Sequence, residues 1–254
     1  MSRPVTFRQT PFLHLFRRIT VFFAALCVLS ACAAPVTKTA FNDPYEKSSR
    51  KVHAFNKGLD QVLVGPAAKG YGTITPPVLI HMISNFSAYL GLPGQAVNNI
   101  LQADAKGFGQ TLLTFTVNSL TFGLGDLASE AGITDNNADF GQTLHVWGVG
   151  QGIYHEMPVL GPSTTRDTIG FVVDTAINPV NLLESSDARW AGFGFSVLDR
   201  LGDRNQYSDV IEDTLYNSED SYITARSLYL QNRDFKLNKG VIDNDNLEDP
   251  FADF

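Results

Sequence analysis

Apolar residues recur at helical spacing along most of the chain, and the alternation typical of strands is almost absent. Two stripes repeat every three or four residues, as one face of a helix requires. The first stripe consists of Val52, Phe55, Leu59 and Val62, and the second of Trp190, Phe193, Val197 and Leu201. The pattern predicts an all-α protein with few or no strands.

The segment from Pro77 to Leu101 is predicted to form an antiparallel helical hairpin. Helices are expected over 78–89 and 93–101, because Gly91-Leu92-Pro93-Gly94 between them can supply a short turn. Each helix would measure about 14 to 20 Å at 1.5 Å per residue, which suits one leaflet better than a whole hydrocarbon core of about 30 Å. We therefore expect this pair to dip into a bilayer.

Capping residues mark three further helices. Asp104 is the expected N-cap of a helix that runs toward Leu120. A Ser/Thr cluster opens a second helix, which is expected to end at Ile177 because Asn178-Pro179 follows. A last helix is expected over 221–237, where apolar and aromatic residues again keep the helical register.

Charge is nearly absent from the middle of the chain. Few charged side chains occur between residues 70 and 165, and the stretch 70–103 contains no acidic or basic residue except His81. A helix exposed to water would carry a charged face over such a length. Two interpretations follow, helices buried in a soluble core or helices lying in part of a lipid leaflet, and composition leaves both open.

The N-terminus has the features of a bacterial lipoprotein signal. An uncharged run, Ile19 to Ala31, follows two arginines and is too short to span a bilayer. It leads into Leu29-Ser30-Ala31-Cys32, which resembles the lipobox, in which the cysteine thiol receives a diacylglycerol. We expect residues 1–31 to be removed, Cys32 to carry the lipid anchor, and residues 32–41 to form a tether. The alternative is an ordinary signal peptide with a chance cysteine.

The mature chain is predicted to be acidic. Without the signal, 15 Lys and Arg stand against 26 Asp and Glu, a charge of about -11. Such a surface repels phosphate backbones, which argues against a nucleic-acid partner. The segment 241–254 has five acidic residues and no basic one, so we expect a disordered tail. Its apolar residues are candidates for binding a partner: Leu247, Phe251 and Phe254.

Motifs for catalysis and cofactor binding are missing from the sequence. The segment Gly148-Val149-Gly150-Gln151-Gly152 is only superficially like a dinucleotide-binding loop, because no βαβ pattern surrounds it, and a flexible turn is expected there. Neither a zinc-binding histidine spacing nor a G-x-S-x-G nucleophile elbow occurs. We predict no metal, no other cofactor and no enzymatic activity, while a catalytic triad scattered along the chain stays an open alternative.

Six short motifs occur in order along the predicted helical domain, residues 42–240. They are Asn42-Asp43-Pro44, Ile83-Ser84-Asn85-Phe86, Val97-Asn98-Asn99-Ile100-Leu101-Gln102, Asp139-Phe140-Gly141-Gln142-Thr143-Leu144, Trp147-Gly148-Val149-Gly150 and Leu160-Gly161-Pro162-Ser163-Thr164. This ordered set resembles the VacJ/MlaA lipoproteins of the outer-membrane lipid asymmetry system. The chain departs from the family pattern at single positions: Ser49, Ala103, His145, Ile153 and Ser221.

The resemblance implies a helical ring embedded in the inner leaflet of the outer membrane, beside trimeric porins, with an amphipathic channel at its centre. Phospholipids mislocalised to the outer leaflet would pass through the channel to a soluble periplasmic phospholipid carrier. Ala33 after the cysteine fits the sorting rule for the outer membrane, so the resemblance places the lipid-anchored protein on its periplasmic side. The alternative function is a scaffold lipoprotein without a channel, which tethers a periplasmic partner by its acidic tail.

Two groups of residues are candidates for the lipid path that the resemblance implies. The first is a glycine-rich segment whose backbone freedom and indole ring suit a gate at headgroup level: Gly141, Trp147, Gly148, Gly150 and Gly152. The alternative for this segment is a loop needed only for folding. The second group is expected to face the polar interior or other helices: Asn85, Asn98 and Asn99.

Overall fold

The protein is described by a computed structural model over residues 43–134, 136–178 and 185–238. The chain divides into two units, residues 1–40 and 41–254, and every described residue belongs to the second. The predictions for the signal peptide, for the lipid anchor at Cys32 and for the tail residues Leu247, Phe251 and Phe254 lie outside the described residues.

The first helices form a long bent arm. Helix α2 (Glu46–Leu59) continues through a π-helical segment, η1 (Asp60–Val64), into helix α3 (Gly65–Ile74). The predicted apolar stripe is on α2 and η1, but Phe55 and Val62 are exposed, and the buried side chains of α2 are Ser49 and His53. The helix is therefore confirmed, and its apolar face points away from the interior.

Helix α4 (Pro77–Leu101) is one continuous helix of 25 residues, so the predicted hairpin is wrong. Pro93 lies inside it and has no N–H to donate to the preceding turn. The helix continues because α4 packs along α5 and α9, and because the side-chain amide of Asn98 donates to the carbonyl of Gly94 at 3.3 Å. A helix of this length measures about 38 Å, so the match to one leaflet no longer applies.

Helix α5 (Ala105–Asn118) begins as predicted, since the side chain of Asp104 accepts a hydrogen bond from the Gly107 N–H at 2.8 Å. A short 3-10 segment, η2 (Ser119–Thr121), and helix α6 (Leu127–Glu130) follow it. None of the helices in the described ranges is long and apolar enough to cross a membrane.

A two-stranded hairpin separates the next two helices. Helix α7 (Phe140–Val146) leads through a glycine-rich turn into strands β1 (Tyr154–Met157) and β2 (Gly161–Thr164), which pair antiparallel. Helix α8 (Thr165–Ile177) follows directly, with the Thr164 hydroxyl as its N-cap acceptor. The predicted end of α8 at Ile177 is confirmed, and the hairpin agrees with the expectation of few strands.

The remaining elements are again helical. They are α9 (Ser186–Gln206), α10 (Ser208–Glu212), a second π-helical segment η3 (Asp213–Asn217) and α11 (Ser221–Leu237). The bounds of α11 agree with the predicted helix over 221–237. Its first turn is capped by Asp220, whose carboxylate accepts from two backbone N–H groups.

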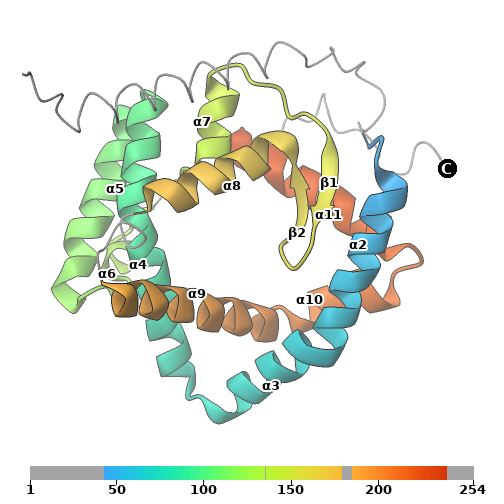
Figure 1. Ribbon diagram of the computed structural model, residues 1–254. Helices are drawn as coiled ribbons and strands as arrows, with labels where there is room; N and C mark the ends of the chain where they lie inside the picture. The colour runs from blue at the N-terminus through green and yellow to red at the C-terminus, as the bar shows by residue number, and fades with distance from the viewer. Residues whose placement is uncertain (1–42, 135, 179–184, 239–254) are drawn as a thin grey trace, which may run out of the picture. The chain divides into compact units, whose positions relative to one another are not determined.

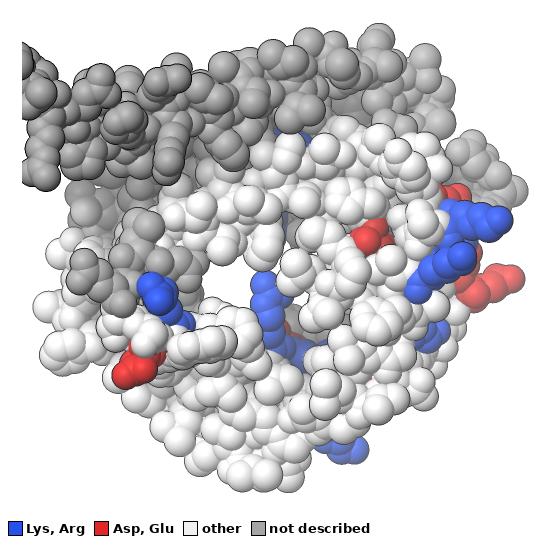
Figure 2. Space-filling view, in the orientation of Figure 1, with Lys and Arg blue, Asp and Glu red and all other residues white. Residues whose placement is uncertain are grey.

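Contacts between these elements close the second unit around an opening (Figure 1). Helix α2 packs on β1, β2 on α8, α8 on α7, α7 on α4, and both α4 and α3 on α9. The space-filling view shows the unit hollowed at its centre, with basic side chains on one side of the hollow (Figure 2). The all-helical, ring-shaped fold is therefore confirmed.

The hydrophobic core of this ring is small. Its buried cluster consists of Tyr154, Tyr222 and Ile223, with Tyr229 and Leu230 packed against it. These residues come from β1 and α11, so the core lies where the hairpin meets the last helix. Outside this cluster the buried residues in the described part of the chain are more often polar than apolar, so other contacts must stabilise the interior.

Candidate functional site

Large apolar side chains are exposed at many positions of the ring. Val62 is 79%, Ile74 83% and Phe122 81% exposed, and these residues belong to different parts of the perimeter. Exposed apolar side chains occur also on α4, α5, α8 and α11. Because a water-soluble monomer rarely exposes so many large apolar side chains, this exposure favours contact with another apolar phase.

Helix α9 illustrates the outward orientation. Its predicted stripe forms one face of the helix, and Trp190, Phe193 and Val197 on that face are all exposed. The opposite side packs inward, where Gly202 is buried with a side-chain carbon of Ile80 close by. In the space-filling view most of the visible face is without charge (Figure 2). The exposed large apolar side chains of the ring are called the rim below. They include five residues of the two predicted stripes, which periodicity alone would assign to a core: Phe55, Val62, Trp190, Phe193 and Val197.

The interior shows the opposite polarity, because most of its fully buried side chains are polar. Asn98 is 1% exposed, and Asn99, Thr111 and Thr143 are 0% exposed. The amide of Asn99 donates to the Thr111 hydroxyl at 3.0 Å, which joins α4 to α5. The Thr143 hydroxyl donates to the Asn98 carbonyl oxygen at 3.0 Å, which joins α7 to α4. Both asparagines of the predicted lipid path therefore make helix contacts.

Asp174 extends this network to α8. One of its carboxylate oxygens accepts from the Asn98 amide at 2.8 Å, and the other accepts from the Phe140 N–H at 2.9 Å. Burial raises the pKa of Asp174, although both hydrogen bonds act in the opposite direction. Asn85, the third asparagine of the prediction, donates instead to the carbonyl of Leu124 at 3.2 Å.

A partly buried ionic cluster joins α7, α8 and α11. Arg233 donates to both carboxylate oxygens of Asp139, at 2.6 and 2.8 Å, and to Asp167 at 2.9 Å. The Tyr229 hydroxyl donates to the other oxygen of Asp167 at 2.6 Å. Burial alone would raise the pKa of Asp167, but the hydrogen bond from Tyr229 and the charge of Arg233 lower it. These contacts join residues that are far apart in the sequence, so no local sequence pattern predicts them.

The glycines of the predicted gate differ in their surroundings. A Cβ on Gly170 of α8 would lie 2.5 Å from the Gly141 nitrogen, so α7 and α8 approach each other closely at this pair. Gly148 and Gly152 have φ of +83° and +78°, a backbone conformation that favours glycine. At Gly150 an added Cβ would meet no atom within 4 Å. Of the four glycines, only Gly150 has neither a steric nor a conformational requirement for its small size.

Trp147 begins the turn after α7. Its indole N–H donates to the carbonyl of Leu101, at the end of α4, at 3.0 Å, and its ring packs edge-on against Phe140. The ring is nevertheless partly exposed. Trp147 therefore both fixes the turn to α4 and presents an aromatic surface outward.

His53, Glu156 and Ser221 form a trio with the distances of a catalytic triad, in which His53 and Glu156 are buried and Ser221 is partly buried. His53 Nδ1 lies 2.8 Å from Glu156 Oε1, and Nε2 lies 3.0 Å from Ser221 Oγ. The two backbone N–H groups that follow Ser221, however, already donate to the carboxylate of Asp220, at 3.1 and 3.2 Å. This helix end therefore lacks the donors of an oxyanion hole, and the trio ties α2 to β1 and α11.

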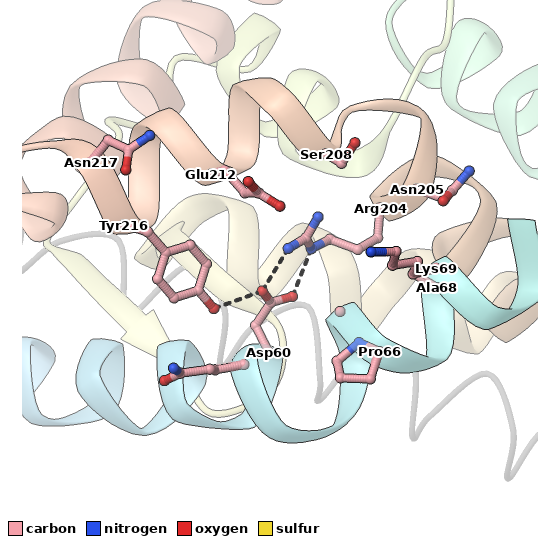
Figure 3. Close-up of a pocket in the computed structure, with 12 residues that line it drawn as sticks. Asp60, Pro66, Ala68, Lys69, Arg204, Asn205, Ser208, Glu212, Tyr216 and Asn217 are labelled. Atoms are coloured by element: carbon pink, nitrogen blue, oxygen red, sulfur yellow. Dashed lines mark hydrogen bonds and ion pairs between the residues drawn. The ribbon is translucent and has the colours of Figure 1, made fainter.

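An open cavity of about 550 Å³ lies between the first and last thirds of the unit (Figure 3). Across it, Arg204 of α9 donates to both carboxylate oxygens of Asp60 in η1, at 2.8 and 2.9 Å, and the Tyr216 hydroxyl of η3 donates to Asp60 at 2.9 Å. Burial opposes ionisation of Asp60, but these hydrogen bonds outweigh it and lower its pKa. The sequence prediction did not include this cavity, since its walls come together only in the folded ring.

The fold and the placement of polar and apolar side chains define a helical ring protein whose exterior suits an apolar environment. The family described as "MlaA lipoprotein" matches residues 41–236. The chain therefore belongs to the MlaA lipoprotein family, as its motifs predicted.

Curated relatives and a solved structure agree with this membership. An uncharacterized protein of Rickettsia typhi is 32% identical over 196 residues, 76% of either chain. The intermembrane phospholipid transport system lipoprotein MlaA of Escherichia coli is 29% identical over 235 residues, 89% of this chain and 90% of the relative. A solved structure from the work "Structural basis for maintenance of bacterial outer membrane lipid asymmetry" is similar with a TM-score of 0.68 and 31% identity, covering 77% of this chain and 99% of that one.

Proposed function

We propose that this protein is an outer-membrane lipoprotein of an intermembrane phospholipid transport system. It forms a passage that removes mislocalised phospholipids from the outer leaflet and hands them to a periplasmic lipid carrier. The names of its relatives from Escherichia coli and Haemophilus influenzae support the transport system. The observation that carries the proposal is the reversed polarity of the ring, in which large apolar side chains are exposed and most of the fully buried side chains are polar.

The reversed polarity suits a ring that lies in lipid. A protein gains nothing from exposing large apolar side chains to water, whereas acyl chains solvate them at no cost. Buried asparagines and threonines, in turn, hydrogen-bond one another and so stabilise helix contacts without a large hydrophobic core. An acyl anchor on Cys32 would hold the ring at the membrane, and the rim would set how deeply the ring lies in the lipid.

Passage through such a ring requires no bond to be made or broken. A headgroup would cross the membrane plane along polar side chains that border the opening, while its acyl chains stay in contact with apolar surface. The turn from Trp147 to Gly152 lies beside this ring, and we assign it the shaping of the path. Tail residues Leu247, Phe251 and Phe254 are assigned to contact with the carrier, and the rim to contact with membrane proteins such as trimeric porins.

The proposal can be tested by complementation. A diderm bacterium that lacks its own MlaA lipoprotein is supplied with this chain, and phospholipid in the outer leaflet is measured with a membrane-impermeant amine-reactive reagent. Restoration of low outer-leaflet phospholipid is the expected result. Cys32→Ala should lose this effect, and intact-mass analysis should find acyl mass on the wild-type chain only.

If the protein is instead a scaffold, its function should depend on the tail and not on the ring. A tether acts through its tail, so removing residues 241–254 would abolish its function while charges on the rim would be harmless. A passage depends on the embedded ring, so rim charges should abolish function. If residues 33–254, without the acyl anchor, remain monodisperse in detergent-free buffer and do not bind vesicles, the embedded ring is refuted.

A further inference from the structure

The cavity that contains Asp60 and Arg204 has the features of a site for a small charged group. Its volume of about 550 Å³ falls within the usual range of ligand pockets, about 300 to 1,000 Å³. Residues from η1, α3, α9, α10 and η3 line it, so segments at both ends of the described chain build it together. A site assembled from distant segments is well defined only in the folded ring.

Both π-helical segments of the described chain line this one cavity. Asp60 and Gln61 come from η1, and Tyr216 and Asn217 come from η3. A π-helical turn is less stable than an α-helical turn and occurs mostly where a function requires its altered side-chain directions. Here the two segments turn Asp60 and Tyr216 toward each other, so that their side chains meet at 2.9 Å.

The cavity contains one ion pair and two further charged side chains. Asp60 and Arg204 neutralise each other through two hydrogen bonds. Lys69 and Glu212 also line the cavity, are exposed, and make no ion pair with any residue in the described ranges. In the close-up the guanidinium of Arg204 lies between Glu212 and Lys69 (Figure 3). The cavity thus presents one unpaired cation and one unpaired anion, separated by a neutralised pair.

The segments that line the cavity also have exposed apolar side chains outside it. Val62 and Leu63 belong to η1, Val210 to α10 and Ile74 to α3, and all four are exposed. Because Val210 is two residues from both lining residues of α10, Ser208 and Glu212, it lies on the other face of that helix.

We infer that this cavity is a headgroup site for a zwitterionic phospholipid, with the phosphate at Lys69 and the ammonium group at Glu212. The inference rests on the proposed function, and it deepens it by naming the lipid class. A headgroup with a phosphate and an ammonium ion matches both unpaired charges, and the polar amides and hydroxyl around them can accept or donate further hydrogen bonds. An anionic headgroup without a cation would leave Glu212 opposed by like charge.

The test measures which lipid the protein retains. The full-length lipoprotein is purified in detergent, incubated with mixed micelles of equal amounts of phosphatidylethanolamine and phosphatidylglycerol, and repurified, and the bound lipids are quantified by mass spectrometry. The wild-type protein should retain phosphatidylethanolamine in excess. Glu212→Lys should raise the ratio of phosphatidylglycerol to phosphatidylethanolamine about fivefold, because it replaces an attraction for the ammonium group with an attraction for anions.

Two further variants separate recognition from folding. The exchange Lys69→Glu with Glu212→Lys keeps one charge of each sign at the cavity and should return the ratio toward the wild-type value. Glu130→Lys makes the same charge change on α6, at an exposed position outside the cavity, and should leave the ratio unchanged. Soluble glycerophosphoethanolamine should compete with bound lipid, whereas inorganic phosphate at equal concentration should not.

The outcomes distinguish the inference from the proposed function. If the wild-type protein and all variants retain lipid in the same ratio, the headgroup site is refuted while lipid binding stands. If Glu130→Lys shifts the ratio as far as Glu212→Lys, the effect belongs to net charge and the site is again refuted. If the wild-type protein retains no lipid at all, the proposed function itself fails.

Discussion

The outward face of α9 and the interface of α7, α8 and α11 are opposites in composition and exposure. The α9 face consists of Trp190, Phe193 and Val197, all exposed and without ionic contacts. The interface consists of Arg233 between two aspartates, and all three side chains are partly buried. In an ordinary globular domain the apolar residues would be buried and the charged residues would be exposed.

The difference indicates which contacts hold the ring together. Periodic apolar residues provide no interior here, because they face outward, and stability between helices comes from hydrogen bonds and ion pairs in narrow interfaces. Such polar contacts fix geometry strictly, since a buried charge or amide is favourable only with its partner in place. A ring that must keep an opening benefits from contacts that hold helices apart at set distances.

The largest expected effect comes from breaking the ionic interface. Arg233→Ala would remove the cation of Asp139 and one of the two arginines beside Asp167, which keeps Arg166 at 3.6 Å. In this partly buried setting the loss should cost about 3 kcal/mol of unfolding free energy. Thermal unfolding of the full-length lipoprotein in detergent, followed by circular dichroism, measures the loss. Lys236→Ala removes an exposed cation from the next turn of the same helix and should have little effect. Equal losses in both variants would contradict a special role for the ionic cluster.

A charge on the rim should act on membrane binding and not on folding. Phe193 is exposed, so Phe193→Lys removes little packing and should hardly change thermal stability in detergent. In a bilayer the same change should cost about 2 to 4 kcal/mol if the residue lies at hydrocarbon depth. Partition of the protein into vesicles measures this cost. Gln206→Lys, at the exposed end of α9, is the control, and an equally strong effect there would argue against an embedded rim.

Local signals predicted the ends of helices well. The N-cap at Asp104, the end of α8 at Ile177 and the bounds of α11 follow from capping and proline chemistry within a few residues. Pro93 misled the prediction of a hairpin, because the packing of α4 against its neighbours outweighs the loss of one backbone hydrogen bond.

The orientation of the apolar stripes and the buried polar contacts were not predictable from local sequence. Periodicity shows that Phe193 and Val197 share one face, but the same pattern serves for packing against protein or against lipid. Arg233 is 94 residues from Asp139, and His53 is 103 residues from Glu156. Only the closure of the ring brings such pairs together, so the candidate site was predicted as a set of motifs and not as a geometry.

The ionic interface should also make stability depend on pH in acid. The pKa of Asp167 is lowered in the folded state, so its contribution is complete above the ordinary pKa of 3.8 and is lost as the pH falls through the lowered value. Asp174 affects stability in the opposite direction. Burial raises its pKa, so its protonation at lower pH stabilises the folded state. Asp167→Asn should therefore make the fall of the melting temperature below about pH 4 shallower. Asp174→Asn removes a gain in stability that occurs as the pH falls from the raised pKa toward 3.8, so the melting temperature should fall more steeply on acidification above about pH 4. Identical slopes would contradict both assignments.

In the glycine-rich turn, substitutions at Gly148 and Gly150 should affect stability to different extents. Gly148 has a φ of +83°, so Gly148→Val should cost about 1 to 2 kcal/mol through backbone strain. At Gly150 φ is not positive and an added Cβ meets no atom within 4 Å, so Gly150→Val should change the melting temperature little.

If the turn shapes the lipid path, the branched side chain of Gly150→Val stiffens the backbone there and should raise outer-leaflet phospholipid by more than it lowers protein abundance. Immunoblotting and the amine-reactive assay measure the two quantities in the same cells. A fall in abundance as large as the rise in outer-leaflet phospholipid would favour the alternative of a loop needed only for folding. The ratio of the two effects in Gly150→Val therefore decides between a turn that shapes the lipid path and a loop needed only for folding.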